Sequence, residues 1–213
     1  MKKILVFDLD GTLVNTIFDI AYSMNIALKE YNLPTHDVNK YIDFIGQGVL
    51  VLGKRAVGDN VSEEVLNSVI KRYKEVYKNN LTNFSKPYPN INEVLTELKE
   101  KGYKLGVISN KPHEDTIEVV NYYFPNIFEY VVGAKDKVNR KPDPMAMNIL
   151  LEHFGYNITD VAYIGDSRYD AMFSENCGCD YYLFTHGYDK LEAIKTFKPV
   201  EFLNESKDLL IYF

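Results

Sequence analysis

The chain has 213 residues, 46% of them hydrophobic, so it can bury a full core as one domain with an insert or as two small domains. Its formal net charge of −6 argues against nucleic acid or an anionic membrane as the main partner, while leaving room for a local basic pocket that binds a phosphorylated metabolite. Cys177 and Cys179 are the only cysteines, which indicates packed, reduced thiols rather than a zinc site. Met1-Lys2-Lys3 leads directly into an apolar run without a signal peptide or long apolar segment, so we expect a cytoplasmic protein that does not enter a membrane.

The first predicted strand ends on two carboxylates. Ile4–Phe7 is an apolar run of the kind that is buried on both faces of a parallel sheet, and Asp8, Asp10, Gly11 and Thr12 follow it. Because the carboxyl ends of parallel strands face the ligand crevice, we expect Asp8 and Asp10 at its floor. Two carboxylates this close repel each other unless a cation such as Mg2+ neutralises them. The alternative is that both are ordinary turn residues after a strand.

A block of helical patterns follows, over residues 15–82. Apolar residues recur at helical spacing from Ile17 to Tyr31, and shorter helical runs cover residues 38–44 and 49–57. A long amphipathic helix begins after Ser62. Pro and Asn cluster over residues 83–90, where we place the return to the main domain. We therefore expect a core of residues 1–14 and 83–213 and an inserted all-helical domain of residues 15–82.

From residue 90 onward, strand and helix patterns alternate. Asn90 and Glu93 resemble a capping box at the start of the first of these helices. The predicted strands are Tyr103–Ile108, Tyr130–Val132, Val161–Ile164 and Asp180–Phe184, and the predicted helices include Pro112–Tyr123, Asp143–Phe154 and Ser167–Cys177. Such alternation predicts an α/β fold with a parallel sheet covered by helices on both faces.

Two polar stretches come after predicted strands in the middle of the chain. Ser109 and Asn110 follow one strand, and their hydroxyl and amide groups can bind phosphoryl oxygens without adding charge. The alternative is plain turn chemistry. Lys141 precedes Pro142 at a helix entrance, where its ammonium could offset the charge of Asp8 and a phosphate. The alternative is a solvated loop lysine.

A third acidic stretch follows the predicted strand Val161–Ile164. Gly165 and Asp166 come directly after it, and Asp170 follows four residues later. If the helix starts at Ser167, Asp166 points into the crevice as a metal ligand, and Asp170 can hold Lys141 or a metal-bound water. The alternative is that Asp166 caps the helix and Asp170 complements its dipole.

Taken in order, these stretches resemble the four motifs of the haloacid dehalogenase superfamily. The matching residues are Asp8-x-Asp10-Gly11-Thr12, Ser109-Asn110, Lys141-Pro142 and Gly165-Asp166-x-x-x-Asp170. The resemblance spans essentially the whole chain. It implies a Rossmann-like core with a helical cap domain inserted between the first and second motifs, which matches the block of residues 15–82.

The resemblance implies a mechanism centred on two aspartates. Asp8 would attack phosphorus and form an aspartyl-phosphate. Asp10 would protonate the leaving alkoxide and later deprotonate the hydrolytic water. Mg2+ would be held by Asp8, the backbone carbonyl of Asp10, and Asp166.

Further residues carry supporting roles by the same resemblance. Thr12, Ser109, Asn110 and Lys141 would stabilise charge on the equatorial oxygens of the transition state. Asp170 would support the metal and the lysine from outside the ligand set.

Four features indicate which branch of the superfamily the chain resembles. An intact Asp10 argues against the dehalogenase and phosphonatase branches, and Thr12 is usual in phosphatases, where related mutases usually carry Val. The segment around Gly46-Gln47-Gly48 and the pair Gly187-Tyr188 resemble phosphoglycolate phosphatases.

Gly46 and Gly48 would let a small carboxylated substrate approach the backbone closely, or they form a plain turn between helices. Asn15, where relatives commonly have Asp, departs from the narrow subfamily pattern, as does Phe173 where a small residue is usual.

We therefore expect a Mg2+-dependent phosphomonoester phosphatase acting on a small phosphorylated metabolite, with phosphoglycolate as the best single substrate. A β-phosphoglucomutase-like sugar-phosphate mutase or a pyrophosphatase on the same scaffold is the alternative, and hydrolysis of many monoesters without a bisphosphate activator would count against the mutase. A non-catalytic binding domain is a third hypothesis, and loss of Asp8, Asp10, Lys141 or Asp166 would have favoured it.

Overall fold

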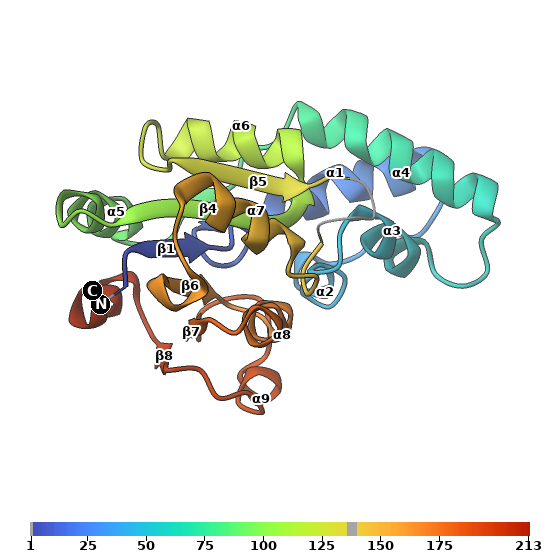
Figure 1. The fold of residues 1–213 in the computed structure, drawn as a ribbon. Coiled ribbons are helices and arrows are strands. Elements are labelled where there is room, and N and C mark those ends of the chain that lie inside the picture. The colour runs from blue at the N-terminus through green and yellow to red at the C-terminus, as the bar shows by residue number, and fades with distance from the viewer. Residues whose placement is uncertain (1, 136–139) are drawn as a thin grey trace. The chain divides into compact units, whose positions relative to one another are not determined.

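The computed structural model describes residues 2–135 and 140–213 of the chain. It divides into two compact units, one of residues up to Val14 together with Pro87–Phe213 and one of Asn15–Lys86. The first unit is built on a sheet, and the second is helical (Figure 1). The two connections between them, β2 (Val14–Asn15) and β3 (Lys86–Pro87), pair as a two-stranded sheet.

A parallel sheet of six strands forms the centre of the first unit, in the order β5-β4-β1-β6-β7-β8. The strands are β1 (Ile4–Phe7), β4 (Lys104–Pro112), β5 (Tyr130–Ala134), β6 (Val161–Gly165), β7 (Asp180–Phe184) and β8 (Glu201–Leu203). The expected first strand, β1, lies between β4 and β6 and is completely buried, as its continuous apolar run predicts.

Helices cover both faces of this sheet, so the expected α/β class is confirmed (Figure 1). They are α5 (Ile91–Glu100), α6 (His113–Tyr123), α7 (Met145–Phe154), α8 (Arg168–Cys177), α9 (Leu191–Ile194) and α10 (Leu209–Tyr212). On one face, Met147 and Leu150 of α7 and Phe173 of α8 share a buried cluster with Val6 and Tyr163 of the central strands. Phe173, which departs from the small residue expected there, is therefore a core residue.

Strand β4 is longer than the pattern predicted, because it continues from Ile108 to Pro112. Its pairing with β5 shifts register between Ile108 and Pro112. Such an irregularity bends a strand and redirects its side chains. Ser109 and Asn110 therefore lie within a strand, and the alternative that they form an ordinary turn is wrong.

The second unit contains four helices, as the sequence predicts for this block. They are α1 (Ile17–Glu30), α2 (Val38–Ile42), α3 (Val49–Val57) and α4 (Glu63–Lys78). Ser62 caps α4, with its hydroxyl accepting from the backbone amide of Val65. The amphipathic pattern of α4 buries Val69 and Tyr73. Among the residues that the structure describes, every helix is too short or too polar to cross a bilayer.

The boundary where the chain leaves the helical unit differs from the expected one at residue 83. Asp19 of α1 is completely buried, and its carboxylate accepts hydrogen bonds from the backbone amides of Phe84 and Ser85. These contacts keep residues 84 and 85 with the helical unit, which ends at Lys86.

Candidate active site

The predicted site residues of the first unit gather where β1, β4 and β6 end. Asp8 follows β1, and its backbone amide donates to the carbonyl of Ile164, which extends the pairing of β1 with β6. Asp166 follows β6 and is buried. Parallel strands end at the same edge of a sheet, which brings these residues together although more than a hundred positions separate them in the chain.

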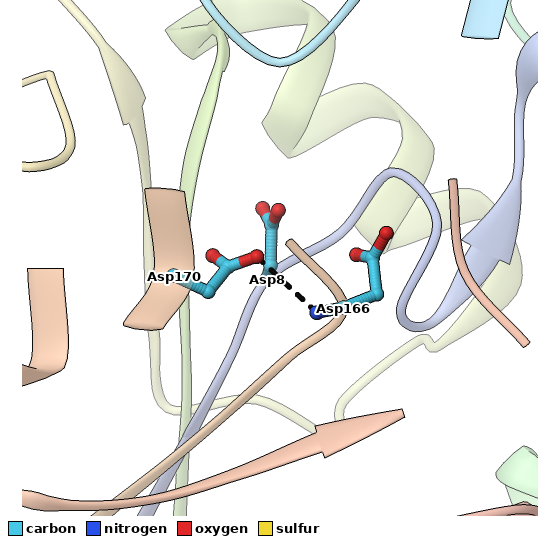
Figure 2. A group of neighbouring side chains, drawn as sticks. All are labelled: Asp8, Asp166 and Asp170. Carbon is cyan, nitrogen blue, oxygen red and sulfur yellow. Dashed lines mark hydrogen bonds between the residues drawn. The ribbon is translucent and has the colours of Figure 1, made fainter. Parts of the chain in front are cut away.

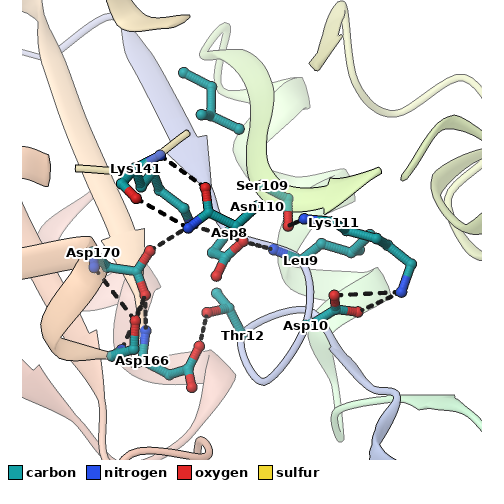
Figure 3. Close-up of polar contacts among 12 residues, drawn as sticks. Asp8, Leu9, Asp10, Thr12, Ser109, Asn110, Lys111, Lys141, Asp166 and Asp170 are labelled. Carbon is teal, nitrogen blue, oxygen red and sulfur yellow. Dashed lines mark hydrogen bonds and ion pairs between the residues drawn. The ribbon is translucent and has the colours of Figure 1, made fainter. Parts of the chain in front are cut away.

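Lys141 is the cation of this cluster. Its ammonium lies 2.9 Å from Oδ1 of Asp8 and 2.7 Å from Oδ1 of Asp170. Its side chain is only 2% exposed, so the alternative of a solvated loop lysine is wrong. The side chain of Asn110 holds the lysine backbone on both sides: Oδ1 accepts from the Lys141 amide at 2.8 Å, and Nδ2 donates to the Lys141 carbonyl at 3.1 Å. Asn110 therefore positions Lys141 (Figure 3).

Asp170 connects the lysine to the start of α8. Its Oδ2 accepts from the backbone amides of Asp166 and Ser167 and from the Ser167 hydroxyl, while its Oδ1 pairs with Lys141. Ser167 is the N-cap of α8 and forms a capping box with Asp170, so the alternative that Asp166 caps this helix is wrong. Gly165 allows the approach, since a Cβ there would lie 2.4 Å from the side chain of Asp170.

Asp166 is held by groups from two other segments. Its Oδ1 accepts from the Thr12 hydroxyl at 2.6 Å, and its Oδ2 accepts from the Tyr188 amide at 2.8 Å. Gly187 passes directly over it, because a Cβ at this position would lie 2.1 Å from the Cβ of Asp166. The pair Gly187-Tyr188 therefore influences the site by contacting Asp166. The sequence alone does not reveal this contact, because the residues are brought together only by the tertiary fold.

Burial raises the pKa of two of these carboxyl groups. It raises the pKa of Asp8 to about 6, and the Lys141 ammonium only partly opposes this. It also holds the pKa of Asp166 well above its usual range, with the charges of Asp170 and Asp8 acting in the same direction. Burial lowers the pKa of Lys141, but the attraction of Asp170 and Asp8 outweighs it, so that pKa lies above its usual value.

The three buried carboxylates could together hold a divalent metal ion. One oxygen each of Asp8, Asp166 and Asp170 lies within 4.8 Å of the others (Figure 2). One Lys141 ammonium against three carboxylates leaves an excess of two negative charges when all are ionised, which a divalent cation would neutralise. Each oxygen of Asp170 already meets at least two donors, whereas each oxygen of Asp166 accepts one hydrogen bond from the described residues, so Asp8 and Asp166 are the better ligands.

Asp10 lies on the side of Asp8 opposite Lys141 and pairs with a different lysine, Lys111 (Figure 3). The ammonium of Lys111 lies 3.0 Å from Oδ1 and 3.3 Å from Oδ2 of Asp10 (Figure 3). Ser109 lies at the base of this lysine, where its hydroxyl accepts from the Lys111 amide at 3.3 Å. Lys111 was not among the predicted site residues, although it directly follows Ser109-Asn110 in the sequence.

Tyr163 of β6 is a second residue that the sequence pattern missed. Its hydroxyl accepts from the Lys141 ammonium at 3.0 Å and lies 3.0 Å from the carbonyl oxygen of Ile108 and 3.2 Å from Oδ1 of Asp170. In the sequence it stands within an apolar strand and is read as a core residue. Only the position of its hydroxyl shows that it touches the polar cluster.

Gly46 and Gly48, the other predicted site residues, belong to the helical unit. Both have positive φ, 100° and 84°, and Gly48 is the N-cap of α3. Glycine adopts such backbone angles without the steric cost that other residues incur. Their predicted contact with a substrate stays a prediction.

Comparison with known proteins gives a consistent result. Residues 5–184 match the haloacid dehalogenase-like hydrolase family. The chain is 36% identical over 195 residues to a phosphoglycolate phosphatase of Haemophilus influenzae (strain 86-028NP), covering 88% of this chain and 87% of the relative. It is 33% identical to a phosphoglycolate phosphatase of Mannheimia succiniciproducens, covering 98% and 96% of the two chains.

A solved structure is also closely similar. The crystal structure of a predicted phosphoglycolate phosphatase from Haemophilus somnus 129pt superposes with a TM-score of 0.94 at 32% sequence identity, covering 99% of this chain and 97% of that one.

The fold and the site thus define a hydrolase whose core is a parallel α/β sheet, with a cluster of aspartates at the carboxyl edge of that sheet. The chain belongs to the haloacid dehalogenase-like hydrolase family. The resemblance read from the four motifs is confirmed, and the curated relatives named above are phosphoglycolate phosphatases.

Proposed function

We propose that this chain is a Mg2+-dependent phosphatase of small phosphomonoesters, with phosphoglycolate as its substrate. The observation that carries the proposal is the buried cluster in which Lys141 bridges Asp8 and Asp170 beside Asp166. In this proposal, the cluster would supply the nucleophile, the cation and the metal-binding carboxylates that phosphoryl transfer to an aspartate requires. The substrate is proposed from the relatives named phosphoglycolate phosphatase.

The metal ion would be held by Asp8, Asp166 and the backbone carbonyl of Asp10. When bound, Mg2+ would neutralise charge on the carboxylates and on the phosphoryl oxygens. Asp170 stays outside this ligand set in the proposal, because its oxygens are used by Lys141, Tyr163 and the start of α8. It fixes the direction of the lysine and the backbone of Asp166.

In the first step, a carboxylate oxygen of Asp8 forms a bond to phosphorus as the bond to the ester oxygen breaks. The electron pair of that bond goes to the ester oxygen, which takes a proton from Asp10 and leaves as an alcohol. The product on the protein is an aspartyl-phosphate at Asp8.

In the second step, water attacks phosphorus and gives a proton to Asp10. The bond between phosphorus and the Asp8 oxygen breaks, which releases inorganic phosphate and restores the carboxylate. Asp10 returns to its protonated state, so the cycle closes without any other reactant.

Lys141 supplies positive charge next to the attacking oxygen throughout both steps. Its ammonium lies 2.9 Å from Asp8, so it can also reach a phosphoryl oxygen transferred to that carboxylate. Thr12, Ser109 and Asn110 complete the proposed set that stabilises the phosphoryl group. Gly46 and Gly48 of the helical unit stay as proposed substrate contacts.

Phosphate release from a panel of substrates tests the function. We expect release from phosphoglycolate that requires both added Mg2+ and Asp8, with kcat/KM higher than for hexose phosphates, nucleotides or pyrophosphate. Asp8→Asn removes the nucleophile and is expected to abolish release. Asp180→Asn, which makes the same charge change at an exposed residue paired with Lys2, is the matched control and should retain full activity.

Two results would argue against this proposal. A folded wild-type protein that binds Mg2+ but releases no phosphate from any of these substrates would contradict a phosphatase. Activity that appears only with a bisphosphate activator would favour the mutase.

A further inference from the structure

Lys111 is a buried cation that the proposed chemistry has not yet used. Its side chain is 2% exposed, while that of its partner Asp10 is 20% exposed. The ammonium therefore lies behind the carboxylate, and Asp10 is the member of the pair that solvent reaches. We propose that Lys111 is a positioning residue that holds Asp10 in the orientation needed to protonate the leaving group, an inference that rests on the proposed phosphatase function.

Contacts of the backbone around Lys111 determine the direction of its side chain. Lys111 lies in the stretch of β4 where pairing with β5 shifts register, which redirects side chains from the regular alternation of a strand. The Thr116 hydroxyl of α6 lies 3.2 Å from the Lys111 carbonyl oxygen. Gly133 of β5 also packs against this carbonyl, since a Cβ there would lie 2.5 Å from it. Helix α6 and strand β5 thus fix the position of the Lys111 backbone.

The contact also restricts the carboxylate. Both oxygens of Asp10 lie within 3.3 Å of one ammonium, which limits rotation of the carboxyl group about its last bond. The loss of hydration of an ion pair is compensated only when its geometry is good, and here one ammonium contacts both carboxylate oxygens.

The two lysines of the site therefore have different roles in this proposal. Lys141 contacts Asp8 and Asp170, where the phosphoryl group is to be transferred. Lys111 contacts Asp10, where the proton is to be transferred (Figure 3). Removing Lys111 should thus harm proton donation specifically, while the attack by Asp8 stays intact.

Leaving groups that differ in basicity separate these two effects. The alkoxide released from phosphoglycolate is strongly basic and needs a proton as the bond breaks, whereas p-nitrophenolate is a weak base and leaves without one. We expect Lys111→Met to slow the single-turnover release of glycolate by about 100-fold and that of p-nitrophenolate by less than about threefold. Rapid quenching with enzyme in excess over substrate measures this first step apart from the second.

Two further variants make the test specific. Lys111→Arg keeps a positive charge at the same place and should restore part of the glycolate rate. Lys111→Met in an Asp10→Asn background should cause no additional loss, because the lysine acts through Asp10. Lys104→Met is the matched control: Lys104 lies at the other end of β4 in an exposed pair with Glu129 and should leave both rates unchanged.

The outcomes distinguish this inference from the function on which it rests. A wild-type protein that releases no phosphate contradicts the proposed function itself. An active wild type whose Lys111→Met variant loses both rates equally, or shows a raised KM for phosphoglycolate at unchanged kcat, contradicts the positioning role. The second of these results would instead make Lys111 a direct contact of the substrate.

Discussion

Tyr163 supplies one of the contacts that hold the Lys141 ammonium in place. Lys141 is a flexible side chain, and its two carboxylate partners alone would allow several positions of the ammonium. The Tyr163 hydroxyl, 3.0 Å from the ammonium, adds a third partner at a rigid place. The ring itself is completely buried and packs edge-on against Phe173, with 5.1 Å between the ring centroids. A core residue therefore directs a site residue.

Tyr163→Phe should lower activity without harming the fold. Phenylalanine keeps the ring contact with Phe173 and removes only the hydroxyl. We expect kcat/KM for phosphoglycolate to fall about tenfold, the equivalent of one lost hydrogen bond to a charged group, and the fall to lie in kcat rather than in KM.

Tyr181→Phe is the control for this substitution. Tyr181 lies on the neighbouring strand β7, and its hydroxyl donates to Glu175 of α8 at 2.9 Å and accepts from the Lys198 amide, neither of which belongs to the aspartate cluster. Steady-state kinetics and thermal unfolding of both variants make the comparison. If Tyr163→Phe behaves like Tyr181→Phe in activity, the hydroxyl does not position Lys141.

At the scale of elements, one buried carboxylate connects the first helix of the helical unit to the end of that unit. Asp19 of α1 accepts from the backbone amides of Phe84 and Ser85, at 2.9 Å and 2.8 Å, and from the Ser85 hydroxyl at 2.6 Å. These contacts join the first helix of the unit to the last residues before the chain leaves it. A buried charge needs several donors to offset its lost hydration, and here the backbone supplies two of them.

Asp19→Ala should therefore destabilise the protein. The substitution leaves two buried backbone amides without their acceptor and opens a small cavity. We expect the free energy of unfolding to fall by about 2–4 kcal/mol, measured by urea denaturation. Asp59→Ala, at an exposed position of the same unit, should change it by less than about 0.5 kcal/mol. Equal effects of the two substitutions would contradict this connecting role of Asp19.

At the scale of the whole molecule, we expect the acidic cluster to link metal binding to stability. The pKa of Asp8 in the folded protein, about 6, lies above its ordinary value, so the folded state favours the protonated form. This contribution to stability is present below the ordinary pKa and is lost as the pH rises through about 6. A divalent cation that binds the ionised carboxylates would replace it.

Magnesium should thus stabilise the protein more at pH 7.5 than at pH 5. At a free Mg2+ concentration of about 100 times its Kd, the expected gain is about 2.7 kcal/mol at the higher pH. At the lower pH, protons compete for Asp8 and the gain should be smaller. Thermal unfolding with MgCl2 or with EDTA measures this difference.

Asp166→Asn should remove most of the Mg2+ effect, and Asp180→Asn, at an exposed position, should leave it intact. A stabilisation by Mg2+ that is the same at both pH values would contradict the link to Asp8.

The local sequence determined much of the core unit. The continuous apolar run of Ile4–Phe7 predicted a strand buried on both faces, and the alternation of strands and helices predicted a parallel sheet. Four short polar motifs at strand ends predicted which residues lie at the carboxyl edge. These features are local in the chain, because periodicity and strand ends depend on neighbouring residues.

Tertiary structure decided the partners of these residues. The sequence indicated Asn110 and Thr12 as phosphoryl-binding groups, and the structure shows their side chains bonded to Lys141 and Asp166. Asn90 was expected to cap α5 in a capping box. It instead adopts a left-handed backbone with φ of 60° and makes no side-chain cap hydrogen bond within the described part of the chain.

Lys111 and Tyr163 are residues of the site that the sequence did not indicate. Both look ordinary in the sequence, one a charged residue after a polar pair and the other a tyrosine in an apolar strand. Their contacts depend on where one ammonium and one hydroxyl lie relative to polar groups on other parts of the fold. The chain alone determined the strand ends at which charges gather, and only the packing of strands and helices determined which charges face each other.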